Sequence, residues 1–334
     1  MSRSPDPAAQ MQISVLVPTI GRPTDLRSCL SSLVAQSRPP DEVVVVLPSM
    51  ASRCDEVVEE FAGSLRTATV RGSERGIVAA VNLGLTLVRG AIVCLIDDDA
   101  TAPPDWLERI EGWFTDPVVG AVGGPNLRPG QTLRDLPVVS RWDRFRWFGY
   151  GDVRTDRRTK RPQDAHFLVE NNLAWRRWLV PAIDERLVGR DERFGDDITL
   201  SLLNRGYRVI ADPSVYVWHR HVRFDRPTLP DAVNAYSTAH NQTYLWLKHL
   251  PAWRRPLFLA FGLLVGDRSV KGAGTFAAWA LKNAPRPSRA RAILALVWPT
   301  LRGRLAGIRT FRAARGLSKP RSRRSDAMRR TSSR

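Results

Sequence analysis

The chain has 334 residues, of which 43% are hydrophobic and 25% charged, and it carries a formal net charge of +18. This length suits one large α/β domain with an appendage, or two ordinary domains, and the composition excludes general disorder and a multi-span membrane protein. The positive charge favours an anionic partner such as a nucleic acid, an acidic membrane surface or a phosphorylated substrate.

Both ends of the chain are predicted to be disordered. Residues 1–10 are polar, and residues 318–334 are rich in Ser and Arg, so neither end buries enough apolar surface to offset the entropy of ordering. Residues 1–10 do not resemble a signal peptide, and no apolar stretch reaches the roughly 20 residues that span a bilayer. The three cysteines fit neither a zinc site nor a disulfide framework. These features predict a cytoplasmic protein.

The first part of the chain alternates short β-branched runs with helical patterns, which predicts βαβ units and a mostly parallel, Rossmann-like α/β sheet. Strands are expected at residues 13–17, 42–47, 91–96 and 118–123. Thr24 is expected to cap the first helix, a second helix to include residues 57–65, and Gly90 to end the third. Parallel strands end at one shared edge, where open α/β sheets bind their ligands.

The second part of the chain begins with residues 127–162, which lack any period and predict a long functional loop. Further elements are expected as a strand or strand-plus-turn at 167–175, a helix at 198–204 and short strands at 207–210 and 215–218. Beyond Pro227 the chain becomes helical, basic and rich in Trp and Leu, so we place a boundary near Asp225. The sequence therefore predicts an α/β domain over residues 11–225 and a helical, basic region over residues 226–317.

Three carboxylates, Asp97, Asp98 and Asp99, follow an apolar strand. Like charges at this spacing repel one another in a partly desolvated place, and a cation would relieve the repulsion. Alternation along a strand directs Asp97 and Asp99 to one face, where two hard oxygen ligands suit Mg²⁺ or Mn²⁺ together with a diphosphate. A solvated turn that caps the next helix explains the same three residues equally well.

Two further clusters carry acids or imidazoles. Asp196 and Asp197 open a helix, where carboxylates either cap the free N–H groups or accept a proton from a substrate hydroxyl. His219 and His221 follow a short strand. A histidine in such a place is usually structural, although imidazole is also a good ligand for Mn²⁺.

The motifs that carry a family resemblance run in order along the chain: Val17-Pro18-Thr19, Arg75-Gly76 with Asn82-Leu83-Gly84, residues 95–100 with Pro104-Asp105-Trp106-Leu107, residues 170–177, and residues 195–202 with Arg205-Gly206-Tyr207. Together they resemble the family 2 glycosyltransferases of GT-A fold. The match covers about residues 13–221, and the motifs are jointly specific because their order and distances agree with those of the family.

The resemblance implies an enzyme that moves one sugar from a nucleotide-diphosphate donor to an acceptor hydroxyl with inversion, using Mg²⁺ or Mn²⁺. Asp99 and His219 would bind the metal, with His221 as the alternative imidazole, and Asp197 would be the catalytic base. Asn172 and Asp196 would line the acceptor or sugar pocket. The residues expected to bind the donor nucleotide are Pro18, Thr19, Arg22, Gly76, Asn82, Asp97 and Asp98.

The chain departs from the family pattern in two places. Leu47-Pro48-Ser49 stands where an Asp-Asp-Gly-Ser type sequence commonly reads the nucleobase, so base recognition is altered. Asp196 replaces the usual Glu beside the base. No Gln-x-x-Arg-Trp sequence follows Asp197, which argues against a processive polymer synthase.

The helical end contains Trp246, Trp253, Trp279 and Trp298 among leucines and basic residues such as Lys248. This composition predicts either a cap on the α/β domain with a solvated basic face, or a surface that lies on anionic lipid. The second interpretation implies a peripheral enzyme on the inner face of the cell membrane. Its acceptor would then be lipid-linked or a polysaccharide of the cell envelope.

Three other functions compete with this one. A nucleic-acid-binding protein explains the charge but leaves the carboxylate clusters unexplained, so no nucleic acid is expected as a partner. A metal-dependent nucleotidyltransferase normally has a Gly- and Arg-rich phosphate loop, which residues 19–22 match poorly. A catalytically inactive relative that only binds nucleotide sugars remains an alternative, because Leu47-Pro48-Ser49 replaces the sequence that commonly reads the nucleobase.

Overall fold

The computed structural model describes residues 12–50, 53–72, 76–142, 146, 156–189, 193–220, 232–267 and 269–317. The predicted disordered ends, residues 1–10 and 318–334, lie outside the described residues, as do the boundary at Asp225 and the alternative imidazole, His221.

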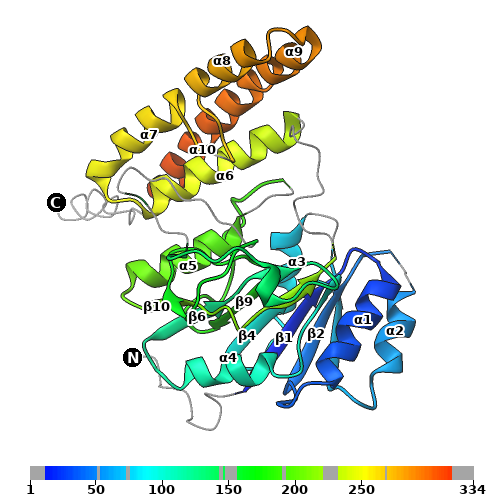
Figure 1. Ribbon diagram of the computed structural model, residues 1–334. Helices are drawn as coiled ribbons and strands as arrows, with labels where there is room; N and C mark the ends of the chain where they lie inside the picture. The colour runs from blue at the N-terminus through cyan, green and yellow to red at the C-terminus, as the bar shows by residue number, and fades with distance from the viewer. Residues whose placement is uncertain are drawn as a thin grey trace, which may run out of the picture.

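An eight-stranded sheet of order β3-β2-β1-β4-β9-β6-β10-β8 forms the centre of the α/β part (Figure 1). Its strands are β1 (Ile13–Pro18), β2 (Glu42–Leu47), β3 (Thr67–Arg71), β4 (Ile92–Ile96), β6 (Val119–Gly123), β8 (Gln163–Asp164), β9 (Asn172–Arg176) and β10 (Arg208–Ala211). β1 pairs in parallel with β2 and β4, whereas β9 is antiparallel to both β4 and β6. The predicted mostly parallel α/β sheet is confirmed.

A second, three-stranded sheet has the order β5-β11-β7 and consists of β5 (Ala100–Thr101), β7 (Asn126–Leu127) and β11 (Val217–His219). The strand β11 is antiparallel to β5, and this register pairs His219 with Ala100. Because β5 follows the three aspartates directly, the small sheet brings His219 beside them although the two are far apart in sequence.

Helices cover both faces of the large sheet. They are α1 (Pro23–Val34), α2 (Cys54–Glu60), α3 (Ile77–Leu85), α4 (Trp106–Phe114) and α5 (Phe194–Asn204). Apolar residues of α1, α2 and α4 share one buried core, and those of α3 and α5 share the other. The central strands β1, β2 and β4 are therefore buried on both sides, as their continuous apolar sequences require.

Several predicted helix boundaries were wrong. Thr24 does not cap α1, because the helix begins at Pro23, whose fixed φ and missing N–H suit a first helical position, and Arg22 is the capping residue. The helix α3 ends at Leu85, well before Gly90, and α2 ends at Glu60, before Leu65. Residues 167–175 were predicted as a strand or strand-plus-turn, and the structure has a turn at residues 170–171 followed by β9, which begins at Asn172.

The remaining helices form a helical segment, here residues 232–317. They are α6 (Ala232–His249), α7 (Arg255–Leu264), α8 (Ala273–Lys282), α9 (Pro287–Ala295) and α10 (Val297–Leu317). The segment lies on the α3 and α5 side of the sheet (Figure 1), and α6 packs along α10. Tyr244 and Trp246 of α6 belong to the same buried core as Ile198 of α5, so the end of α6 is joined to the α/β part.

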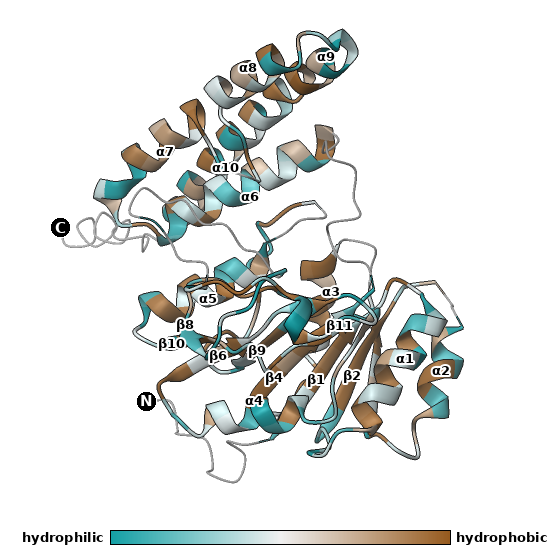
Figure 2. Cartoon of the chain, viewed as in Figure 1, coloured by the Kyte–Doolittle hydropathy of each residue, from teal (hydrophilic) through white to brown (hydrophobic). Residues whose placement is uncertain are grey.

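Hydropathy distinguishes the two parts of the molecule. Figure 2 shows apolar strands enclosed by the helices of the α/β part, whereas α7 in the helical segment is apolar over most of its length. Among the described residues, no helix combines the length and the apolar character needed to cross a bilayer.

Candidate active site

Asp97, Asp99 and His219, here called the acid-histidine group, converge at the carboxyl end of β4. The Nε2 atom of His219 lies 3.3 Å from Asp97 Oδ2 and 3.0 Å from Asp99 Oδ1. One possible ligand atom from each residue lies within 4.8 Å of the other two. The aspartates follow β4, as predicted, and lie in the turn between β4 and β5, which the Ala100 N–H closes by donating to the Asp97 carbonyl.

The acid-histidine group has the donor atoms that a divalent cation needs. Burial disfavours the charged form of His219, but hydrogen bonds to Asp97 and Asp99 and the charges of these carboxylates outweigh it and raise the His219 pKa to about 9. A proton on His219 therefore neutralises part of the carboxylate charge. Two carboxylate oxygens and an imidazole nitrogen are equally suited to a Mn²⁺-type ion, which would take the place of that proton.

Asp98 has different partners from its two neighbours. It is buried and accepts hydrogen bonds from the Thr19 hydroxyl and from the Arg22 guanidinium. Burial raises the Asp98 pKa, and the bonds to Arg22 and Thr19 oppose this rise. Arg22 Nη1 also lies 2.8 Å from Asp99 Oδ2. Asp98 thus fixes the loop after β1 against the aspartate turn.

The other predicted donor residues lie at the end of β1 and at or within α3. Pro18 ends β1 beside Val46 of β2. Gly76 precedes α3 with a φ of 102°, a conformation that favours glycine. Asn82 lies further along α3, where its side chain donates to the Ile183 carbonyl (2.9 Å) and accepts from the Ile183 N–H (2.7 Å). Asn82 therefore holds the segment around Ile183.

Two residues predicted to line the acceptor or sugar pocket are engaged in internal contacts. Asn172 is wholly buried, accepts from the Trp106 indole N–H (3.0 Å) and donates to the Val215 carbonyl (2.9 Å). Asp196 is buried and accepts from Arg193 Nε at 2.7 Å. These contacts join β9 to α4 and brace the beginning of α5, so both residues have structural partners in the α/β part.

Asp197, the predicted base, lies in the first turn of α5 and is held by two side chains from the end of α6. Its Oδ1 accepts from His249 Nε2 at 2.6 Å and from Lys248 Nζ at 2.8 Å, and its Oδ2 accepts from Lys248 at 3.0 Å. The sequence indicated Lys248 only as one of many basic residues and gave no reason to select His249. The neighbouring Lys and His in the last turn of a long helix are the one signal that it offered.

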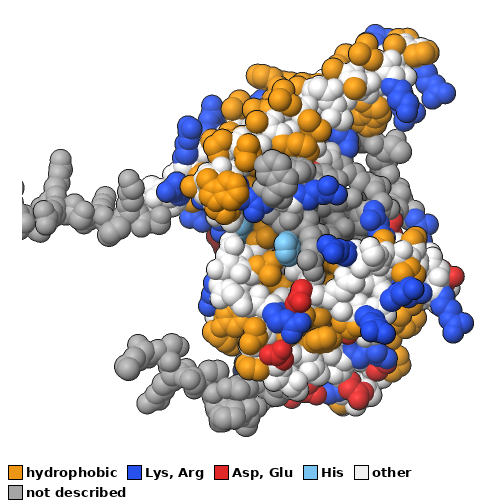
Figure 3. Space-filling model, turned by 60° about the vertical axis from the view of Figure 1, so that its left-hand side comes forward, with side chains coloured by type: hydrophobic (Ala, Val, Ile, Leu, Met, Phe, Trp, Pro, Cys, Tyr) orange, Lys and Arg blue, Asp and Glu red, His pale blue; other side chains and the backbone are white. Residues whose placement is uncertain are grey.

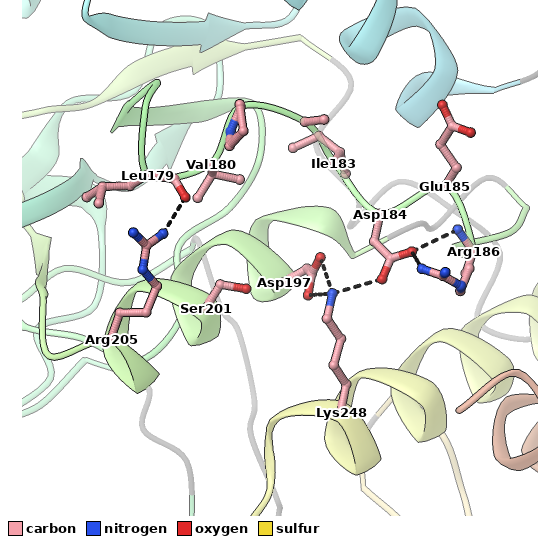
Figure 4. A pocket seen from close by; sticks show the side chains of 12 residues that line it. Leu179, Val180, Ile183, Asp184, Glu185, Arg186, Asp197, Ser201, Arg205 and Lys248 are labelled. Carbon is pink, nitrogen blue, oxygen red and sulfur yellow. Dashed lines mark hydrogen bonds and ion pairs between the residues drawn. The ribbon is translucent and has the colours of Figure 1, made fainter. Parts of the chain in front are cut away.

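Two cavities adjoin these residues. The first, here called the Asp197 cavity, has a volume of about 670 Å³, within the usual range for ligand sites. Residues 179–186 line one side, and Asp197, Ser201, Arg205 and Lys248 line the other (Figure 4). The second cavity, of about 540 Å³, includes Asp99, Trp218 and Arg220 in its lining. Both the candidate base and a candidate metal ligand therefore border open space.

Asp184 connects the wall of the Asp197 cavity to α6. It accepts from the Tyr244 hydroxyl at 2.5 Å and from Lys248 Nζ at 2.8 Å (Figure 4 shows the latter). Burial alone would raise the Asp184 pKa, but the hydrogen bonds from Lys248 and Tyr244 and the Lys248 charge lower it to about 2. Asp184 therefore stays ionised throughout the physiological range.

Asp184→Asn is expected to lower the free energy of unfolding at pH 7 by about 2 kcal/mol. The folded-state pKa, about 2, lies below the usual 3.8, so ionised Asp184 stabilises the fold above the unfolded-state pKa. This contribution is lost as the pH falls through the folded-state pKa, and roughly half of it remains at pH 3. Urea unfolding of both proteins at pH 7 and pH 3 measures the change. An equal difference at the two pH values would contradict the ion-pair explanation, and Glu59→Gln, an exposed carboxylate of α2, is the control.

The comparisons with known proteins agree with this architecture. Residues 14–178 match the family described as glycosyl transferase family 2, and the chain belongs to that family. Its fold is shared by a *Pyrobaculum calidifontis* mannosyltransferase, PcManGT, in complex with GDP-Man and Mn²⁺ (TM-score 0.53, 20% identity, 91% and 86% of the two chains). *S. aureus* TarS 1-349 in complex with UDP-GlcNAc also shares it (TM-score 0.55, 16% identity, 91% and 90%).

Sequence relatives match a shorter part of the chain. A glucosyl-dolichyl phosphate glucuronosyltransferase of *Haloferax volcanii* is 34% identical over 119 residues, which is 34% of this chain and 38% of the relative. The putative glycosyltransferase EpsH of *Bacillus subtilis* is 31% identical over 111 residues, 32% of each chain. These alignments span only about a third of each relative.

Proposed function

We propose that this chain is a metal-dependent glycosyltransferase that moves a single sugar from a nucleotide-diphosphate donor to an acceptor hydroxyl, with inversion at the anomeric carbon. The observation that carries the proposal is the acid-histidine group, whose ligand atoms lie within 4.8 Å of one another at the carboxyl edge of the sheet in a family 2 chain. The complex of PcManGT with GDP-Man and Mn²⁺ supports it.

The proposed reaction divides the work between two places. At the acid-histidine group, Asp97, Asp99 and His219 would hold a divalent cation, which neutralises the charge of the departing diphosphate. At the first turn of α5, Asp197 accepts the proton of the acceptor hydroxyl while that oxygen bonds to the anomeric carbon. The bond between this carbon and the diphosphate oxygen breaks in the same displacement, so the configuration inverts.

Donor binding is tested by calorimetry over a panel of nucleotide sugars, with Mn²⁺ present or removed by EDTA. At least one donor is expected to bind in Mn²⁺ and to lose most of its affinity in EDTA. Donor binding of the same strength in both conditions would contradict a shared metal and diphosphate site. Magnetic resonance of the product sugar then tests inversion, because retention of the anomeric configuration is incompatible with a single displacement.

We also propose that the acceptor is lipid-linked or part of a cell-envelope polysaccharide, and that the helical segment lies on the anionic inner face of the cell membrane. Large apolar side chains of this segment are exposed by 64–74%, namely Trp253, Leu264, Leu281 and Trp298. Figure 3 shows apolar side chains gathered over the helical segment with Lys and Arg beside them. The names of a dolichyl phosphate glucuronosyltransferase and of the O-antigen biosynthesis protein RfbC of *Myxococcus xanthus* support such an acceptor.

Liposome flotation is expected to recover the protein with anionic vesicles and not with neutral ones, because Trp and Leu enter the interface while basic residues meet the headgroups. The double substitution Trp253→Ala and Trp298→Ala is expected to reduce this recovery severalfold. Trp178→Ala, an exposed tryptophan of the α/β part, is the matched control. Equal recovery on both kinds of vesicle, or recovery on neither, would exclude the proposed membrane surface.

A further inference from the structure

We propose that Lys248 and His249 are positioning residues that aim one oxygen of Asp197 at the acceptor, so that the helical segment completes the catalytic centre. This inference rests on the proposed function of Asp197 as the base. It adds two residues from α6 to a site otherwise built by the α/β part. Asp197 then acts together with Asp184, to which Lys248 links it, and not as an isolated carboxylate.

The hydrogen bonds distinguish the two oxygens of Asp197. An ionised carboxylate offers about two acceptor positions on each oxygen. Oδ1 accepts from both His249 and Lys248, whereas Oδ2 accepts from Lys248 alone among the described residues. Asp197 also lines the Asp197 cavity. Oδ2 is therefore the oxygen that keeps an acceptor position for the proton of an incoming hydroxyl.

His249 is held in the orientation that this arrangement needs. Its Nδ1 lies 3.2 Å from Asn204 Nδ2, and its Nε2 lies 2.6 Å from Asp197 Oδ1. When the Asn204 amide donates to Nδ1, the imidazole proton is on Nε2 and points at Asp197. Asp197 and Asn204 are about two turns apart on α5, so His249 is braced along one face of that helix.

Lys248 bridges Asp197 and Asp184 (Figure 4). Burial opposes the charged form of Lys248, but the charge of Asp197 and the hydrogen bond to Asp184 raise the Lys248 pKa. The low pKa of Asp184, about 2, keeps that carboxylate ionised. When Asp197 takes a proton, Lys248 therefore retains a counter-ion, and the reaction leaves no unpaired buried charge.

A third contact fixes α6 relative to the first turn of α5. Arg193, which precedes α5, has a φ of 50°, an unfavourable conformation for a residue with a side chain. Its guanidinium lies 5.3 Å from the centre of the Trp246 ring and binds Asp196 at 2.7 Å. Trp246, Lys248 and His249 thus reach the same helix end from one turn of α6.

The test compares kcat and the donor KM for transfer by the full chain and by Lys248→Met. Charged groups near Asp197 are Lys248 and His249 from α6, Asp184, Glu185 and Arg186 from the opposite wall, and Arg205 just after α5. We expect kcat to fall roughly 10-fold or more, while the donor KM changes less than about 2-fold, because Lys248 contacts Asp197 and Asp184 and is not one of the proposed donor-binding residues.

Matched variants separate positioning from folding. Lys248→Arg is expected to restore most of kcat, and His249→Gln, which keeps a donor near the Nε2 position, is expected to exceed His249→Phe. Lys282 is an exposed lysine at the end of α8, and Lys282→Met is expected to leave kcat and the donor KM unchanged. If urea unfolding shows that Lys248→Met does not fold, the comparison of the two His249 variants decides. An unchanged or higher kcat in Lys248→Met, or equal activity of the His249 variants, overturns the inference. Absence of transfer by the unsubstituted chain refutes the proposed function instead.

Discussion

Replacing Asp197 by Asn is expected to reduce kcat for sugar transfer about 1000-fold while nucleotide-sugar binding persists. The amide has nearly the shape of the carboxylate and its oxygen can still accept from His249, but it cannot take the proton of the acceptor hydroxyl. Steady-state transfer assays measure the loss, and calorimetry measures donor affinity.

Glu59→Gln neutralises an exposed carboxylate of α2 and serves as the control for the change in charge. Urea unfolding of Asp197→Asn is needed as well, because the substitution also removes the ion pair with Lys248. Full activity of a folded Asp197→Asn protein would refute the assignment of Asp197 as the base.

Asp99→Ala is expected to reduce transfer at least about 100-fold and to remove the dependence of donor binding on Mn²⁺. Asp99 supplies one of the three possible metal ligands, and its side chain is only 3% exposed, so water cannot readily replace it. Titration with Mn²⁺, followed by electron paramagnetic resonance, measures metal binding directly. Activity is measured in parallel.

His219→Ala provides an independent test of the same site, because it removes an imidazole ligand and leaves the contact between Arg22 and Asp99 in place. Both variants are expected to bind Mn²⁺ more weakly than the unsubstituted chain. Nucleotide binding that is unaffected by Asp99→Ala and by a chelator would refute the metal site.

The strands that could be predicted from the sequence are those buried on both faces. A continuous run such as Glu42–Leu47 has few stable alternatives to a central strand. Thr67–Arg71 was not predicted because it forms an edge strand, is only partly buried and has a short, mixed sequence. Phe167 and Leu168 are buried without being in a strand. Their apolar character alone therefore could not show that the strand begins only at Asn172.

Some residues of the candidate site can be identified from local sequence patterns, whereas others are brought to it only by the packing of distant elements. Asp97 and Asp99 could be selected because they follow a strand whose place in the sheet is predictable, whereas His219 was selected through the family resemblance. The partners of Asp197 could not, since Lys248 and His249 follow it by 51 and 52 residues. Their position depends on how α6 packs against α5. Asn172 could be recognised by its motif, but its complete burial depends on Trp106 and Val215.

Release of nucleoside diphosphate from a panel of nucleotide sugars is the most direct test of metal-dependent sugar transfer. Each donor is incubated with the full chain in Mn²⁺, Mg²⁺ or EDTA, with and without a lipid-linked acceptor. We expect release from at least one donor in Mn²⁺ or Mg²⁺, no release in EDTA, and release about 1000-fold slower with Asp197→Asn in the presence of acceptor. Release that is equally fast in EDTA, or absent with every donor and both cations, would contradict the proposed function.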